Sequence, residues 1–253
     1  MTAAAPLPPI EAARVAARAL PLLDLTDLSE ACTPEAVAAL CDRAKRHAVA
    51  AVCVWPRFVA QAAQALAGSG VRIATVVNFP DGGEAVAATV AQTRAALADG
   101  ADEIDLVLPY RALLRGAAET ARAMVASVRE ACGEKRLKVI LEIGMLPDTE
   151  TVARASRLAL EAGADFLKTS TGKTPVSATP EAAEAMLSVI REGHGERPVG
   201  LKMSGGLRRI EDAARYLALA DRIMGPAWVG PNTFRIGASS LLDDLTRAAE
   251  AAA

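Results

Sequence analysis

The sequence has little lysine, little histidine and almost no net charge. Its 28 basic residues nearly balance 30 acidic ones, which gives a formal net charge of −2 over 253 residues. Such a balance provides no broad cationic surface, so a nucleic acid is not expected as a principal partner. Only six of the basic residues are lysines and 22 are arginines, so the position of each lysine is informative.

Metal-binding and membrane-spanning patterns are also missing. The two histidines lie far apart and the four cysteines form no C-x-x-C pair, so no metal is expected and a reducing, cytoplasmic location is favoured. No apolar run is long enough to cross a membrane. Glu11, Arg14 and Arg18 interrupt the region in which a signal peptide would lie, so none is expected.

Short β-rich segments alternate with alanine-rich helical segments, and no linker divides them. We expect one domain over residues 1–253, in which residues 1–20 form an N-terminal extension with a short helix from Pro9. The expected strands are Leu22–Leu25, Ala51–Val54, Arg72–Val77, Glu103–Leu108, Leu137–Glu142, Asp165–Thr169, Val199–Met203 and Phe234–Ile236. Helical segments include Pro34–Arg46, Gly83–Ala98, Ala112–Ala131, Thr149–Ala162, Pro180–Arg191 and Ile210–Ala218. This alternation predicts an α/β fold, a single (β/α)8 TIM barrel.

The alternative to a barrel is a doubly wound open sheet that binds a dinucleotide. Such a fold normally has a glycine-rich turn directly after its first strand. The early candidate here, Gly68-Ser69-Gly70, precedes a strand instead of following one. The sequence therefore favours the barrel and predicts no nucleotide cofactor.

Charged residues stand inside strands that should be apolar. Asp105, Lys168 and Lys202 each lie among apolar neighbours, where an unpaired charge is costly. Lysine, unlike arginine, can lose its proton when it is buried or close to another cation. A neutral amine can attack a carbonyl to form a Schiff base. Two lysines on neighbouring strands therefore indicate an imine-forming site, although solvation of the barrel mouth would explain either lysine alone.

Glycine and hydroxyl clusters follow the last three strands. These clusters comprise Ser170 to Lys173, Gly205-Gly206 and Gly237 to Ser240. Glycine lets backbone N–H groups approach an anion, and the loops after the last strands of such barrels often bind phosphate. Gly172-Lys173-Thr174 is not a nucleotide P-loop, because Leu167 stands where the motif requires glycine.

Together these segments resemble the deoxyribose-phosphate aldolases. The resemblance spans about residues 22 to 245. It rests on LKTSTGK at 167–173, GADEID at 100–105, FRIGASS at 234–240, LDLT at 23–26, VCVWPR at 52–57 and TVVNFP at 75–80. It implies a metal-independent class I aldolase that cleaves 2-deoxy-D-ribose 5-phosphate to D-glyceraldehyde 3-phosphate and acetaldehyde. It also implies a homodimer or homotetramer.

The resemblance further assigns roles to particular residues. Lys168 matches the Schiff-base lysine, Lys202 a second lysine that perturbs it, and Asp105 an aspartate that shuttles protons. Asp24 and Thr26 match polar groups near this relay, and Cys53 matches a residue that lines the pocket. The residues that match the phosphate region are Gly172, Lys173, Gly205, Gly206, Gly237, Ser239 and Ser240.

Three features depart from the family pattern. Met203 and Ile143 replace residues common in relatives, and the chain lacks the tail with a terminal tyrosine that some relatives have. Two other functions stay open. A Schiff-base aldolase or transaldolase for a longer sugar phosphate would need either a further cation for a second phosphate, for which Arg208 is a candidate, or more hydroxyl-binding residues. A non-catalytic sugar-phosphate-binding barrel would lack Lys168, Lys202 or Asp105, and all three are present.

Overall fold

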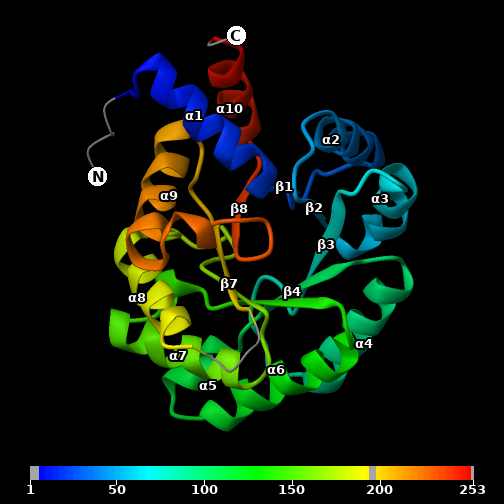
Figure 1. The fold of residues 1–253 in the computed structure, drawn as a ribbon. Coiled ribbons are helices and arrows are strands. Elements are labelled where there is room, and N and C mark those ends of the chain that lie inside the picture. Colours follow the sequence, from blue (N-terminus) through cyan, green and yellow to red (C-terminus); the bar gives the residue numbers. More distant parts are fainter. Residues whose placement is uncertain (1–5, 194–197, 252–253) are drawn as a thin grey trace.

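Eight parallel strands close into a barrel in the order in which they follow one another along the chain (Figure 1). The computed structural model describes residues 6–193 and 198–251. The strands are β1 (Leu23–Asp27), β2 (Ala51–Val54), β3 (Arg72–Val77), β4 (Glu103–Val107), β5 (Arg136–Ile140), β6 (Phe166–Lys168), β7 (Gly200–Ser204) and β8 (Phe234–Ala238). The predicted (β/α)8 barrel is therefore confirmed.

Helices surround the barrel and cover the outer faces of the strands. They are α1 (Pro9–Ala19), α2 (Pro34–Arg46), α3 (Val59–Leu66), α4 (Val86–Ala98), α5 (Tyr110–Leu114), α6 (Ala118–Cys132), α7 (Thr149–Glu161), α8 (Pro180–Arg191), α9 (Ile210–Met224) and α10 (Leu241–Glu250). The expected N-terminal helix is α1, which packs against α10 and α9 (Figure 1). Within the described residues, no helix is both long and apolar enough to cross a membrane.

Side-chain caps determine where several helices begin. The Thr33 hydroxyl accepts a hydrogen bond from the N–H of Ala36, and Thr179 does the same for Ala182. In both helices a proline occupies the first helical position, which needs no N–H donor. These starts agree with the predicted boundaries of α2 and α8.

One predicted helix is wrong. The segment Ala112–Ala131 is not continuous but divides into α5 and α6. Between them Gly116 has a φ of +89°, a conformation that glycine adopts readily and that cannot continue a right-handed helix. A second difference is that α9 continues past the predicted end at Ala218 to Met224.

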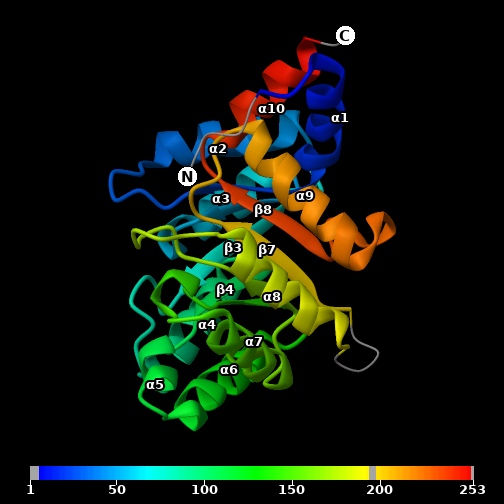
Figure 2. The ribbon, with the colours of Figure 1, turned by 90° about the vertical axis from the view of Figure 1, so that its left-hand side faces the viewer.

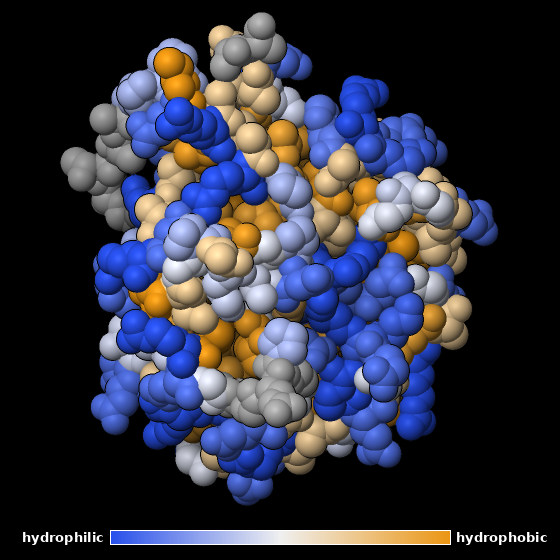
Figure 3. All heavy atoms as spheres, in the orientation of Figure 1, coloured by the Kyte–Doolittle hydropathy of each residue, from blue (hydrophilic) through white to orange (hydrophobic). Residues whose placement is uncertain are grey.

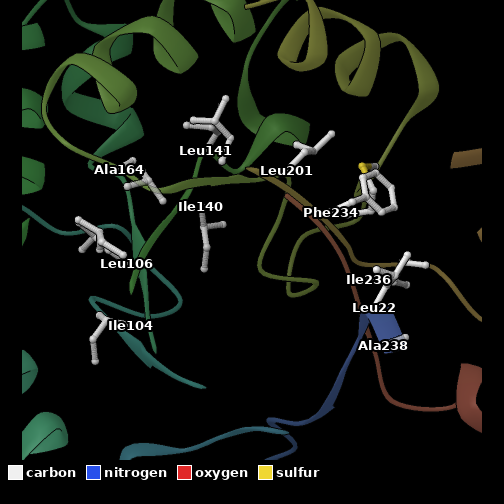
Figure 4. Close-up of a cluster of buried hydrophobic side chains, with 14 of the residues drawn as sticks. Leu22, Ile104, Leu106, Ile140, Leu141, Ala164, Leu201, Phe234, Ile236 and Ala238 are labelled. Carbon is white, nitrogen blue, oxygen red and sulfur yellow. The ribbon is translucent and has the colours of Figure 1, made fainter. Parts of the chain in front are cut away.

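The apolar core lies between the strands and the helices. Figure 4 shows part of it, with Ile104 and Leu106 of β4, Ile140 of β5, and Phe234 and Ile236 of β8. All five side chains are buried. On the outside, hydrophilic side chains cover much of the face in Figure 3. The hydrophobic stabilisation of the fold therefore comes mainly from this layer around the barrel.

The inside of the barrel is charged rather than apolar. Seven buried side chains that carry charge project from six of the strands, namely Asp24, Glu103, Asp105, Lys138, Lys168, Lys202 and Arg235. Small residues make room for them. A Cβ on Gly237 of β8 would lie 2.8 Å from the Cε of Lys202.

Candidate active site

Three lysine side chains from consecutive strands converge on one aspartate. Lys138 of β5 donates to Oδ1 of Asp105 at 2.8 Å. Lys168 of β6 and Lys202 of β7 both donate to its Oδ2, at 2.7 and 2.9 Å. Strand register brings them together, because Lys168 is paired with Lys202 and Asp105 with Lys138. The structure therefore brings the three predicted catalytic residues into direct contact.

The two lysines at the barrel mouth differ in their carboxylate partners. Lys202 contacts Asp105 and also Oδ2 of Asp24, at 2.6 Å. Burial favours the neutral amine, but the two carboxylates outweigh it and raise the pKa of Lys202 well above its usual value. Lys168 shares Asp105 with the other lysines. Burial, with the nearby charge of Lys202, lowers the pKa of Lys168 despite the attraction of Asp105.

The carboxylates remain ionised despite complete burial. Burial alone would raise the pKa of Asp105, but Lys138, Lys168 and Lys202 together hold it well below the usual range. Lys202, Arg235 and Lys138 lower the pKa of Asp24 in the same way, against its burial. The site therefore combines two ionised carboxylates, an ammonium at Lys202 and, at Lys168, an amine whose pKa burial lowers.

A cavity of about 320 Å³ opens above these lysines at the C-terminal ends of the strands. Lys168, Lys202 and Thr26 are among its lining residues. The predicted phosphate residues that also line it are Gly172, Lys173, Gly205, Gly206, Gly237 and Ser239. We call this the mouth cavity. In Figure 2 the loop after β6, in yellow-green, projects at the left edge of the molecule.

Specific contacts hold the rim of the mouth cavity. The ammonium of Lys173 donates to the carbonyl of Leu28 at 2.8 Å, which ties the loop after β6 to the loop after β1. The buried carboxylate of Glu142 accepts hydrogen bonds from the hydroxyls of Thr171 and Thr174, at 2.5 and 3.1 Å. Gly205 has a φ of +89°, and a Cβ there would lie 2.5 Å from the Ser177 hydroxyl. These contacts fix the loop after β6 against its neighbours, and the space at Gly205 admits no side chain.

Three predicted site residues do not line the mouth cavity within the described residues, although one of them, Asp24, contacts Lys202 at its base. Asp24 and Cys53 are fully buried below it, and neither is among its lining residues within residues 6–193 and 198–251. Burial raises the pKa of the Cys53 thiol, which disfavours nucleophilic chemistry there. In the same described ranges Ser240 is not a lining residue either; it precedes α10 as its N-terminal cap position.

A larger cavity of about 740 Å³ lies at the opposite, N-terminal end of the barrel. Its lining includes Arg72, Arg136, Arg129 and Lys135, and each contacts a carboxylate within 3.3 Å. The three arginines keep their charge at all pH values of interest, and all four cations are partly exposed members of ion pairs. Among the lysines that the structure describes, Lys168 at the mouth cavity is the one whose pKa burial lowers.

Comparison with known proteins identifies the family. The family model described as DeoC/LacD family aldolase matches residues 18–247. The chain belongs to this family. The deoxyribose-phosphate aldolase of Agrobacterium fabrum is 53% identical over 234 residues, which cover 91% of this chain and 90% of the relative.

Solved structures agree with membership of the DeoC/LacD aldolase family. The deoxyribose phosphate aldolase of Aeropyrum pernix superposes with a TM-score of 0.75 at 26% identity, over 93% of this chain and 91% of that one. A protein described as QR15, an aldolase, gives a TM-score of 0.77 at 26% identity, over 89% and 95% of the two chains.

Sequence reasoning missed three buried charges in this family member. They are Lys138, Glu103 and Arg235, each at most 1% exposed. The signal that drew attention to Asp105 was present for Lys138 and Arg235 too, because each stands between apolar neighbours in a strand, whereas Glu103 follows Asp102. Alternation along β4 also places Glu103 and Asp105 on the same inner face.

The departures from the family pattern lie away from the mouth cavity. Met203 is fully buried in the outer apolar core, and Ile143 lies in a short 3₁₀ turn after β5. Neither lines the mouth cavity in the parts of the chain that the structure describes. Arg208 does line it and is exposed.

Proposed function

We propose that this chain is a class I aldolase that cleaves 2-deoxy-D-ribose 5-phosphate reversibly to D-glyceraldehyde 3-phosphate and acetaldehyde. The observation that carries the proposal is the pair of lysines at the base of the mouth cavity. Lys168 has a pKa that burial lowers, whereas Lys202 keeps its proton beside Asp105 and Asp24. The curated relative from Agrobacterium fabrum, named for this activity, supports the choice of substrate.

The proposed reaction begins at the amine of Lys168. This amine attacks the aldehyde carbon of the open-chain sugar, and loss of water leaves a protonated imine. The imine withdraws electrons, so the bond between C2 and C3 breaks as the C3 hydroxyl loses its proton. The resulting enamine takes up a proton at carbon, and hydrolysis releases acetaldehyde and regenerates the amine.

Lys202 and Asp105 move protons in these steps. Both groups lie beside the amine of Lys168, because Oδ2 of Asp105 accepts hydrogen bonds from Lys168 and from Lys202. The ammonium of Lys202 can donate a proton to the leaving water, and Asp105 can accept one in return. Asp24 and Thr26 support this relay. Thr26 donates to the backbone carbonyl of Asp24 at 2.8 Å.

The phosphate is proposed to bind at the rim of the mouth cavity. Backbone N–H groups near Gly172, Gly205, Gly206 and Gly237, with the Ser239 hydroxyl, offer donors on one side of the reacting amine. Ser240 would contribute from the position directly before α10, and Lys173 adds positive charge. No metal or organic cofactor is required for this chemistry, because the protonated imine is itself the electron sink.

The proposal extends to the assembly and the location of the protein. We propose one aldolase domain over residues 1–253 that forms a homodimer or homotetramer in the cytoplasm. The Aeropyrum pernix structure is described as tetrameric. The four cysteines are free and buried, which suits a reducing compartment. Light scattering on the purified protein would measure the assembly.

Product analysis with 2-deoxy-D-ribose 5-phosphate is the decisive experiment. We expect equal amounts of acetaldehyde and glyceraldehyde 3-phosphate, with turnover unaffected by chelators. Reduction by borohydride in the presence of acetaldehyde should attach an ethyl group to Lys168. Cleavage of only a longer sugar phosphate would favour the alternative aldolase or transaldolase, and binding without turnover would favour a non-catalytic barrel.

A further inference from the structure

Six of the seven buried charges inside the barrel form a closed ring. Arg235 contacts Oδ1 of Asp24 at 2.5 Å, and Oδ2 of Asp24 contacts Lys202 at 2.6 Å. Lys202 contacts Asp105 at 2.9 Å, and the other oxygen of Asp105 contacts Lys138 at 2.8 Å. Lys138 and Arg235 then share Glu103, at 2.5 and 2.9 Å, which closes the ring.

The charges alternate around this ring, so it is neutral by itself. Three cations separate three carboxylates, and each carboxylate lies between two cations. All six side chains are at most 1% exposed. An alternating arrangement of this kind offsets the cost of burying each charge, whereas a surplus charge would not be offset.

Lys168 is the group that the ring does not include. Its only carboxylate within the described residues is Asp105, and Lys138 and Lys202 already neutralise that carboxylate. A protonated Lys168 would therefore add one uncompensated positive charge to a fully buried site. As a neutral amine it leaves the site balanced, and the amine is the form that attacks a carbonyl.

We propose that Arg235 is a positioning residue that closes this neutral ring and thereby keeps Lys168 as the surplus group that loses its proton. Arg235 is suited to this task because a guanidinium stays charged and binds two carboxylates with separate nitrogens. It does not line the mouth cavity in the described parts of the chain, so it acts through Asp24 and Glu103. This inference rests on the proposed function of Lys168.

The other groups around Lys168 do not provide a buried negative charge that would balance its protonated form. β2 contributes Cys53, whose thiol has a pKa raised by burial, and β3 contributes the apolar Ala74 and Val76. At the N-terminal opening, Arg72 and Arg136 also contact Glu103, with side chains 40% and 22% exposed. At the mouth, Lys173 and Arg208 are exposed cations and Asp27 is a half-buried carboxylate. Solvent screens these groups more than the ring.

The test measures imine trapping as a function of pH. Acetaldehyde is reduced onto the full-length protein with cyanoborohydride, and mass spectrometry quantifies N-ethylation of Lys168. In Arg235→Gln the ring has one carboxylate in excess, so Lys168 should hold its proton more tightly. We expect the midpoint of the trapping profile to rise by about one pH unit. Arg235→Lys should restore the wild-type midpoint.

A second substitution separates charge balance from structural damage. The double variant Arg235→Gln/Glu103→Gln has equal numbers of ring cations and carboxylates again, so its midpoint should return toward the wild-type value. If Arg235 had a structural role alone, the midpoint of the trapping profile in the double variant would be displaced at least as far as in the single variant. Arg129→Gln is the matched control, because Arg129 pairs with Asp165 outside the ring, and its midpoint should not move.

The outcomes distinguish this inference from the proposed function. If wild-type protein traps no acetaldehyde at Lys168, the proposed mechanism fails. If trapping occurs but Arg235→Gln leaves the midpoint unmoved, only the role of Arg235 is overturned. If circular dichroism shows that Arg235→Gln does not fold, the test uses Glu103→Gln, which leaves the ring with one cation in excess. A midpoint below that of wild type supports the ring, and an equal or higher midpoint contradicts it.

Discussion

The two ends of the barrel contain similar charged residues but differ in how those charges are paired. At the N-terminal end, the larger cavity is lined by partly exposed arginines and a lysine, each of which contacts a carboxylate. At the mouth, Lys168 is almost completely buried and shares Asp105, its one carboxylate partner among the described residues, with two other cations. Cavity volume alone would select the wrong end, whereas unequal charge pairing selects the mouth.

The largest effect should come from exchanging Lys168 itself. Lys168→Arg keeps a cation in place but removes the group that can become a neutral nucleophile. We expect cleavage of deoxyribose 5-phosphate to fall by about 10⁴-fold or more, with no acetaldehyde adduct after reduction. Steady-state kinetics and peptide mass spectrometry would measure both.

The matched control is the same exchange at the other end of the barrel. Lys135 lines the N-terminal cavity and pairs with Asp102 at 2.8 Å. An arginine can maintain that ion pair, so Lys135→Arg should retain wild-type kinetics. Comparable loss in both variants would remove the distinction between the two ends.

The sequence predicted the fold and three charged residues of the mouth, but not the contacts among all the interior charges. Asp105, Lys168 and Lys202 could be found because a barrel strand should be apolar and each interrupts one. Asp105 has three lysines around it, and that number depends on strand register, which the sequence does not specify. The role of Arg235 depends on the closure of β8 onto β1, which brings it to Asp24 across 211 residues of chain. Contacts of this range follow from topology rather than from local pattern.

Acid should destabilise the barrel through its interior carboxylates. Burial raises the pKa of Glu103, but Lys138 and Arg235 outweigh it and lower the pKa to about 2. A glutamate in an unfolded chain has a pKa of about 4.3. The stability that Glu103 contributes is therefore complete above about pH 4.3 and is lost as the pH falls toward about 2. Asp105 and Asp24 act in the same direction.

Urea unfolding between neutral pH and about pH 2 would test this dependence. We expect the unfolding midpoint to decline most steeply below about pH 4. Glu84 provides the contrast, because it forms an exposed ion pair with Arg115 at 2.5 Å. Glu84→Gln should leave the acid profile unchanged, since exposed pairs contribute little. A wild-type midpoint that stays constant down to about pH 2.5 would contradict a stabilising role for the interior charges.

A single added methyl group should disturb the mouth more than the other end. A Cβ on Gly237 would lie 2.8 Å from Cε of Lys202 and 3.0 Å from Cβ of Ser204. Lys202 cannot move freely because Asp24 and Asp105 hold its ammonium. We expect Gly237→Ala to lower kcat by about 10- to 100-fold, since small displacements at a reacting site are costly.

Gly230 near the start of β8 supplies the control for this change. A Cβ there meets no atom within 4 Å and its φ is not positive. Gly230→Ala should therefore keep wild-type kcat and thermal stability. Equal activity in the two alanine variants would show that the position of Lys202 is not critical for turnover.

The smallest effect should distinguish two neighbouring serines at the phosphate rim. Ser239 lines the mouth cavity, whereas Ser240 occupies the residue position before α10 and would bind phosphate through its backbone N–H. Ser239→Ala removes a hydroxyl donor to a charged group, a loss of about 1 to 2 kcal/mol, and should raise KM for deoxyribose 5-phosphate by about 10-fold at unchanged kcat. Ser240→Ala retains its N–H, so KM should change less. Because acetaldehyde has no phosphate, its trapping at Lys168 should be equal in both variants, and a change there would place Ser239 in contact with the reacting carbons instead.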